Sequence, residues 1–329
     1  MSLVAPTLQS FFTDRLVNQR QASPQTIVSY RDSLRLLLVF IHEQHAIAPS
    51  RLDWDDLHTE MITTFLDHLE TERHNSARTR NLRLTAIRSL FAYAALRHPE
   101  HANVIQRVLA IPPKRFDRPI VSFLTTTEID ALIAAPDLRR WEGRRDRALL
   151  LVAVQTGLRV SELIGLNCRD VTLGAGASVR CLGKGRKYRA VPLTKPTESV
   201  VRVWIAERNG HDNEPLFSTR TGRRLSPDAI ERLVHKHGTV AQSSCPTIRA
   251  ENLHPHVLRH TCAMTLLQAG VDTAVIALWL GHADIRSTQT YLHADMTIKQ
   301  RALALTTPAT SPPGRYQPAD KLLAFLEAM

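Results

Sequence analysis

Cysteine is scarce in this sequence, and its scarcity excludes two structural classes. The 329 residues include four cysteines, no two of which form a CxxC pair: Cys168, Cys181, Cys245 and Cys262. Without such pairs the sequence indicates neither a zinc ribbon nor a disulfide framework. Reduced thiols in a cytosol fit this usage best.

Long apolar runs are also missing. No run exceeds that of Ala148 to Val154, which is far too short to cross a bilayer. The stretch MSLVAPTLQSFF at the start lacks the basic residues with which a signal peptide begins. We therefore expect a soluble, cytoplasmic protein that does not contact a membrane.

Acidic residues are too few to balance the basic ones. The chain has 42 Lys and Arg against 31 Asp and Glu, which gives a net charge of +11 and a pI near 10.0. This balance favours nucleic acid or another anionic surface as the partner. A soluble basic protein without such a partner is the alternative.

Strand patterns are absent from the first hundred residues, where apolar residues recur at helical spacing. Ser23-Pro24 supplies a cap and a first-turn proline for one helix, and further helices are expected over about 53–70 and 75–97. The sequence thus predicts a small helical domain over residues 1–112.

One stretch of this domain is unusually basic. From Glu72 to Arg118 there are ten Lys and Arg against three acidic residues, so its net charge is +7. A solvated helix face usually mixes both signs to form ion pairs along the helix. We therefore expect Arg80, Arg83 and Arg88 to contact DNA, with a solvated face as the alternative.

A second domain begins after a proline-containing linker at 113–122. The pattern Thr125-x-x-Glu128 is a capping box, and mostly helical patterns continue through the range 123–306. Within that range, apolar residues on both sides of GKGRK predict a β-hairpin. A proline-rich tether and a terminal amphipathic helix are expected over 307–329. The fold class expected is mainly α with a small β-hairpin or sheet.

Polar residues with chemical potential cluster near the C-terminal end. His256, Arg259 and His260 share one face of a predicted helix, since they lie at i, i+3 and i+4. A second short helix ends at Gly281, His282 follows it directly, and Tyr291 comes nine positions later. This pattern suggests a site for one anionic ligand, with a purely structural role as the alternative.

Metal binding is a further alternative for the histidine pair. The helical metalloprotease motif needs Glu after its first His, and Val257 stands there. Arg259 would also repel a cation from the shared face. Arginine forks match phosphate geometry, so a phosphate is the ligand that we favour.

Two earlier motifs add basic and acidic groups. In TGLRVSELIGL, Arg159 and Glu162 lie one turn apart on a predicted helix. Lys184 stands between two glycines in the expected turn, although a lysine at a turn tip is often only solvated. Three further basic residues crowd around it and are expected to bind DNA: Arg186, Lys187 and Arg189.

Taken together, these motifs resemble those of the tyrosine recombinase family, the phage integrases and Xer-type recombinases. The resemblance covers nearly the whole chain and rests on motifs in the family's order: Arg159 in TGLRVSEL, Lys184 in the GKG hairpin, His256-x-x-Arg259-His260, LGH ending at His282, and Tyr291. It implies a helical core-binding domain followed by a catalytic domain. The tail 307–329 is longer than a minimal family member needs.

The resemblance also implies a catalytic set around one nucleophile. The catalytic residues would be Arg159, Lys184, His256, Arg259 and His282, with Tyr291 as nucleophile and Glu162 and His260 in support. It implies a reaction without metal, ATP or other cofactor, at a specific site on double-stranded DNA. A homotetramer, or an assembly with related recombinases, would act on the synapsed DNA in the bacterial nucleoid.

The residue types fit the chemistry of such a site. Arg159 and Arg259 can bind the non-bridging oxygens of a phosphodiester, where negative charge grows in the transition state. His282 can donate to the same oxygens, and Lys184 can protonate the departing 5′ oxygen. His256 is the expected general base for Tyr291, whose ordinary pKa is about 10. The product would be a 3′-phosphotyrosyl link.

Three other functions compete with this interpretation. A type IB topoisomerase-like enzyme would use the same residues to nick and rejoin DNA without a synapse. A catalytically idle DNA-binding protein would have no need of Tyr291. A zinc-dependent regulator is the third alternative.

Overall fold

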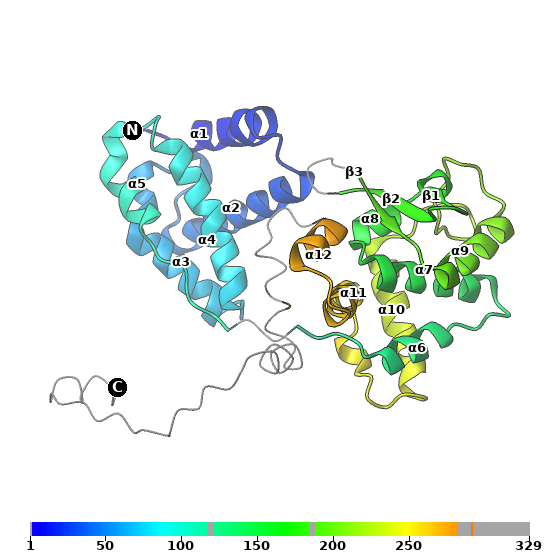
Figure 1. The fold of residues 1–329 in the computed structure, drawn as a ribbon. Coiled ribbons are helices and arrows are strands. Elements are labelled where there is room, and N and C mark those ends of the chain that lie inside the picture. Colours follow the sequence, from blue (N-terminus) through cyan, green and yellow to red (C-terminus); the bar gives the residue numbers. More distant parts are fainter. Residues whose placement is uncertain (1, 118–120, 184–187, 282–290, 292–329) are drawn as a thin grey trace, which may run out of the picture. The chain divides into compact units, whose positions relative to one another are not determined.

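The computed structural model describes residues 2–117, 121–183, 188–281 and 291 (Figure 1). The chain divides into two compact units, Met1–Arg118 and Pro119–Met329. Both are built mainly from helices, and the second also contains a three-stranded sheet. The mainly helical fold with a small sheet is thus confirmed. Among the described helices, none combines the length and apolarity needed to span a membrane.

The first unit consists of helices joined by short turns. Its helices are α1 (Val4–Ser10), which continues into a π-helix (Phe11–Gln19), α2 (Pro24–His45), α3 (Thr59–Thr71), α4 (Ala77–Ala94) and α5 (Ala102–Leu109), with 3₁₀ turns at Pro49–Arg51, Trp54–Leu57 and Pro99–His101. The α4 helix packs against α2, α3 and α5, and these contacts enclose the core (Figure 1). As expected, Ser23 caps α2, accepting a hydrogen bond from the Thr26 amide at 3.2 Å.

The helix expected over 53–70 is in fact two helices. Asp53 caps the 3₁₀ turn Trp54–Leu57, and its own amide donates to the Asp56 carboxylate at 2.8 Å. His58 then has extended backbone and caps α3, accepting from the Met61 amide at 3.2 Å. Two successive caps therefore interrupt the apolar pattern that both helices share.

The other helices of the second unit lie around α7 (Trp141–Thr156), which packs against α6, α9 and α11. Its other helices are α6 (Thr126–Ala134), α8 (Val160–Gly165), α9 (Lys195–Arg208), α10 (Pro227–Gln242), α11 (Pro255–Gln268) and α12 (Thr273–Leu280), with 3₁₀ turns at Cys168–Asp170 and Ala250–Asn252. The expected capping box is present, since the Thr125 amide donates to Glu128 at 2.8 Å.

The predicted hairpin lies in an antiparallel sheet of order β1-β2-β3, in which β1 is Val171–Thr172, β2 is Ser178–Leu182 and β3 is Tyr188–Pro192. In the β2–β3 register, Cys181 pairs with Arg189 and Val179 with Val191. Because side chains alternate along a strand, Arg189 and the buried Val191 lie on the same face of the sheet. Arg189 is therefore directed toward the interior.

A buried polar cluster joins α7 to α10. The Asp146 carboxylate accepts from Arg145 Nε at 2.9 Å and lies 2.8 Å from His237 Nε2. Arg145 also donates to the Ser218 carbonyl at 2.9 Å. All three side chains are buried, so this cluster stabilises the second unit from within.

The structure describes part of the predicted linker and none of the predicted tail. In the predicted linker 113–122, the described residues 113–117 and 121–122 form neither helix nor strand. The tail 307–329 lies outside the described residues.

Candidate active site

Arg259 extends from α11 into the interior of the second unit. It is 4% exposed, and its guanidinium donates to the Gly157 carbonyl at 2.5 Å and to the Leu280 carbonyl at 2.7 Å. Burial, with the nearby charge of Arg159, lowers its pKa to about 10. Arg259 is still cationic at neutral pH, and the two carbonyls fix its orientation.

Gly157 allows the ends of α7 and α12 to approach each other. It ends α7 with a φ of 61°, in the left-handed region that favours glycine. A Cβ at this position would lie 2.5 Å from Cδ2 of Leu280. A larger residue would therefore strain the left-handed backbone and displace the Leu280 side chain.

Arg159 stands at the start of α8 and is the more accessible of the two expected phosphate ligands. Its side chain is 28% exposed. It donates to the Glu162 carboxylate at 2.8 Å and to the Gly281 carbonyl at 3.0 Å. The end of α12 thus contacts both arginines.

Glu162 is a buried acid beside these arginines. It also receives a fork from Arg189, whose two Nη atoms lie 3.0 and 2.8 Å from the two carboxylate oxygens. Burial acts to raise its pKa, but hydrogen bonds from Arg189 and from the Arg159 backbone hold the pKa of Glu162 below its usual range. The carboxylate is therefore ionised at neutral pH.

Arg189, which the sequence predicts to bind DNA, lies with its side chain directed into the second unit. Its side chain is 13% exposed, and besides the Glu162 fork it donates from Nε to the Trp279 carbonyl at 3.0 Å. All of these contacts lie inside the second unit. Alternation along β3 directs the side chain inward, so it does not extend toward solvent as a phosphate ligand would.

Tyr291 lies in the same region, with 3% of its surface exposed. Its ring packs in the apolar cluster that includes Cys262 and Leu280. The Tyr291 hydroxyl lies 3.1 Å from Nδ1 of His260, the residue that the sequence placed in support. Burial raises the pKa of Tyr291 above its ordinary value.

The rings of His256 and His260 on α11 lie side by side, and that of His260 contacts Tyr291. The ring centroids of His256 and His260 are 6.3 Å apart with nearly parallel planes. Burial, followed by the electrostatic influence of the neighbouring His256, lowers the pKa of His260 to about 4. His260 is therefore neutral at pH 7 and can accept a hydrogen bond from the Tyr291 hydroxyl.

The lowered pKa of His260 predicts a specific pH dependence. An unfolded histidine has a pKa of about 6.5, so between that pH and about 4 the unfolded chain binds the extra proton. The stability that neutral His260 contributes should be complete above pH 6.5 and be lost as the pH falls toward 4. In ¹³C-histidine NMR spectra, the signal that disappears in His260→Gln should titrate near pH 4. A midpoint at 6.5 or above would contradict the buried environment.

Four predicted site residues lie outside the described residues: Lys184, Arg186, Lys187 and His282. Their described neighbours are Gly183 and Tyr188 at the hairpin and Gly281 at the end of α12. Gly281 has a φ of 63° and contacts Arg159 through its carbonyl.

One arginine of the basic stretch in the first unit is buried. Arg80 is only 5% exposed, and its Nε lies 3.7 Å from the Glu70 carboxylate. It also donates to the Pro112 carbonyl at 3.5 Å. Arg80 therefore contacts Glu70 and Pro112 inside this unit, and its burial disfavours the expected contact with DNA. Arg83 and Arg88 are partly exposed and remain candidates.

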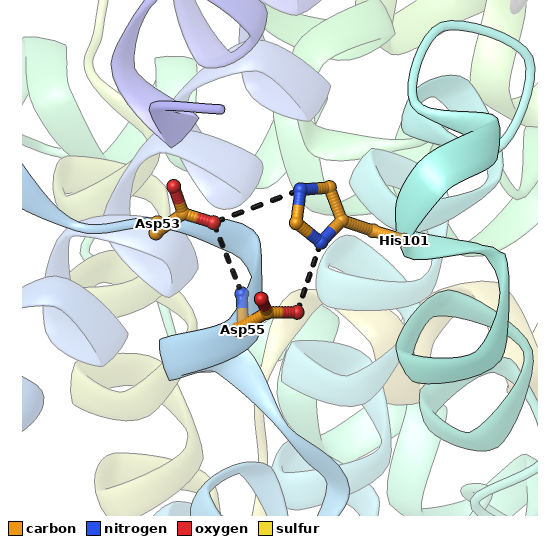
Figure 2. A group of neighbouring side chains, drawn as sticks. All are labelled: Asp53, Asp55 and His101. Atoms are coloured by element: carbon orange, nitrogen blue, oxygen red, sulfur yellow. Dashed lines mark hydrogen bonds and ion pairs between the residues drawn. The ribbon is translucent and has the colours of Figure 1, made fainter. Parts of the chain in front are cut away.

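Among the described residues, one group has donor atoms close enough to hold a metal ion, and it lies in the first unit. Figure 2 shows His101 between Asp53 and Asp55, with Nδ1 2.9 Å from Asp55 and Nε2 3.7 Å from Asp53. Each ring nitrogen faces a different carboxylate. We therefore interpret the group as an imidazole bridging two acids, which joins the 3₁₀ turns on either side.

Comparison with known protein families identifies the family of this chain. The model of the phage integrase family matches residues 122–297, and that of the phage integrase N-terminal SAM-like domain matches residues 10–98. The chain belongs to the phage integrase family. Its members are the tyrosine recombinases, whose motifs the sequence resembles.

Full-length relatives cover both units. A Sinorhizobium fredii protein, y4rC, provisionally called an integrase/recombinase, is 51% identical over 99% of this chain and 98% of its own length. The tyrosine recombinase XerD of Pseudomonas putida is 33% identical over 86% of this chain and 91% of its own. This integrase family member is therefore an enzyme of the tyrosine recombinase class.

The fold also matches a solved structure. The XerH site-specific recombinase bound to palindromic difH substrate, in a post-cleavage complex, has a TM-score of 0.69. It is 24% identical to this integrase, over 87% of this chain and 81% of the XerH chain.

Proposed function

We propose that this chain is a site-specific DNA recombinase that cleaves and rejoins strands through a 3′-phosphotyrosyl link at Tyr291. The observation that carries the proposal is the position of the Tyr291 hydroxyl. It is buried beside a neutral histidine, and it lies close enough to Arg259 for that charge to act on its pKa. Arg159 contacts the same helix end as Arg259.

The two arginines would neutralise the scissile phosphate. A phosphodiester repels nucleophiles because its non-bridging oxygens are negative, and that charge grows as the fifth bond forms. Arg159 and Arg259 each use part of their guanidinium on carbonyls or Glu162, and their remaining N–H groups can donate to the phosphate. Because these contacts orient the donors before DNA binds, little reorganisation is needed.

His256 and His260 would have different roles at the Tyr291 hydroxyl. A side chain with a pKa of about 4 is a weak base for a phenol whose pKa is above its ordinary value. We therefore assign His260 to orienting the Tyr291 oxygen, and we retain His256 as the general base. His282 would donate to the phosphate, and Lys184 would protonate the departing 5′ oxygen.

The proposed partner is double-stranded DNA at a specific site, bound by a homotetramer or together with related recombinases. Arg83 and Arg88 of the first unit would contact the DNA, as would Arg186 and Lys187 of the hairpin. The protein would act in the cytoplasm on DNA of the nucleoid. The reaction exchanges one phosphoester for another, so it needs no ATP, and arginine supplies the positive charge at the phosphate.

Selection from a randomised DNA pool tests this function and identifies the target site in the same experiment. The protein is incubated with duplexes that have a randomised core and a nick, so that the short 5′-hydroxyl fragment diffuses away and cleavage is trapped. We expect SDS-resistant complexes enriched in one sequence. Plasmids with two copies of that sequence should then recombine. Relaxation of supercoiled plasmid without the sequence, and without recombination, would instead indicate a topoisomerase.

A further inference from the structure

Three arginines converge on the C-terminal end of α12. Three consecutive carbonyls each accept from a different guanidinium: Trp279 from Arg189 at 3.0 Å, Leu280 from Arg259 at 2.7 Å and Gly281 from Arg159 at 3.0 Å. The last carbonyls of a helix have no partner within it and carry a partial negative charge. This helix end is therefore the framework that sets the spacing of the two expected phosphate ligands.

Arg189 differs from the other two arginines in its remaining contacts. Both of its Nη atoms donate to Glu162, so all three guanidinium nitrogens are used inside the protein. Arg159 has one Nη on the same carboxylate and is twice as exposed, at 28% against 13%. Arg189 thus connects the end of α12 to Glu162, while Arg159 remains more accessible to a substrate.

We propose that Arg189 is a positioning residue for the cleavage reaction. It anchors the Trp279 carbonyl, and thereby the adjoining carbonyls that orient Arg259 and Arg159. Its positive charge also neutralises the negative charge of Glu162. The positive charge of Arg159 therefore remains available to the phosphate. This inference rests on the recombinase function proposed above.

The packing around Arg189 leaves little freedom for that anchor to move. A Cβ at Gly281 would lie 2.7 Å from Nη1 of Arg189, so backbone and guanidinium are in close contact. Lysine at position 189 would keep the charge but could not bind both Glu162 oxygens and the Trp279 carbonyl in one plane. The helix end would then shift relative to the two phosphate ligands.

Arg189→Lys tests this role, and Arg145→Lys is its matched control. Arg145 also forks onto a buried carboxylate and a backbone carbonyl in the same unit, but within the described part of the chain it has no hydrogen bond to an active-site residue. Both variants should lose thermal stability. Single-turnover cleavage of a nicked duplex selected by the wild type should slow by about 100-fold in Arg189→Lys, the size expected for a displacement of about 1 Å. The cleavage rate constant of Arg145→Lys should remain at the wild-type value.

Two further measurements distinguish a positioning role of Arg189 from other roles: the affinity for DNA and the rate of cleavage of an uncharged substrate. The dissociation constant of Arg189→Lys for the duplex should stay near that of the wild type. A methylphosphonate at the scissile position has no negative charge to neutralise, so there the defect should shrink. Should lysine not support folding, Arg189→Gln keeps an N–H for the Trp279 carbonyl and replaces it in the same assays.

Each other outcome overturns the inference. An unchanged cleavage rate, a loss of affinity as large as the loss of rate, or a defect of full size on methylphosphonate would exclude positioning of the two arginines. Failure of the proposed function is a different result, because the wild type itself would then form no covalent complex.

Discussion

Replacing Tyr291 with phenylalanine should abolish covalent capture of DNA and leave DNA binding intact. The substitution removes one oxygen, the only atom of the side chain that can attack a phosphodiester. The ring, which is 3% exposed in its apolar cluster, should keep its packing. The measurement is SDS-resistant complex on nicked duplex, with affinity followed by gel shift. We expect no complex from Tyr291→Phe at unchanged affinity.

Tyr188→Phe is the matched control for this variant. Tyr188 belongs to the same unit and is 69% exposed on β3, where the Arg180 guanidinium lies 5.7 Å from its ring centroid. Loss of the Tyr188 hydroxyl should leave the yield of covalent complex unchanged. Capture by Tyr291→Phe together with loss of capture by Tyr188→Phe would move the nucleophile to the hairpin.

Removing either arginine of the site should produce the second largest effect. Loss of one transition-state donor typically costs about 10²–10³ in rate, and an arginine on a phosphoryl group can contribute about 10³–10⁵. We expect Arg159→Ala and Arg259→Ala to slow cleavage on that scale in single-turnover assays. Affinity for the duplex should change much less, because most binding comes from contacts along the backbone.

The two variants should differ in stability. Arg259→Ala leaves the buried carbonyls of Gly157 and Leu280 without their donor, at a cost of about 1–3 kcal/mol for each. Arg159 is more exposed, so its loss should lower the melting temperature less. Arg202→Ala, which removes an exposed ion pair to Glu198 on α9, is the control. Affinity that falls as steeply as the rate would make the arginines ordinary binding residues.

Arg80 shows where charge counting overrode a pattern already present in the sequence. It lies four and seven positions before Leu84 and Ile87, on the same helical face as these buried residues. The helical period therefore places it inside. The net charge of the stretch around it favours DNA contact. A buried arginine needs a partner, however, and Glu70 supplies one from the preceding helix.

The inward direction of Arg189 also has a signal in the sequence. Alternation along β3 puts it on the face of Val191, which is buried, and this signal was available from the predicted hairpin. The position of Glu162 was not available, because it lies 27 positions away in sequence and on another element. Only the fold shows that an inward arginine on β3 meets an acid on α8.

The helix faces of the site were predictable, but its connections were not. Spacing alone placed Arg259 and His260 together on α11 and predicted the end of α12 at Gly281. The contact between Arg159 and the Gly281 carbonyl spans 122 positions. The apposition of His260 and Tyr291 likewise depends on how Tyr291 packs against α11.

Mass spectrometry of the covalent complex tests the central claim most directly. The SDS-resistant complex is digested with nuclease and trypsin, and the peptide that carries a nucleotide remnant is sequenced by fragmentation. We predict a 3′-linked nucleotide on the oxygen of Tyr291, in the peptide that begins after Arg286. A nucleotide on any other residue, or a 5′-linked remnant on Tyr291, would contradict the proposed chemistry.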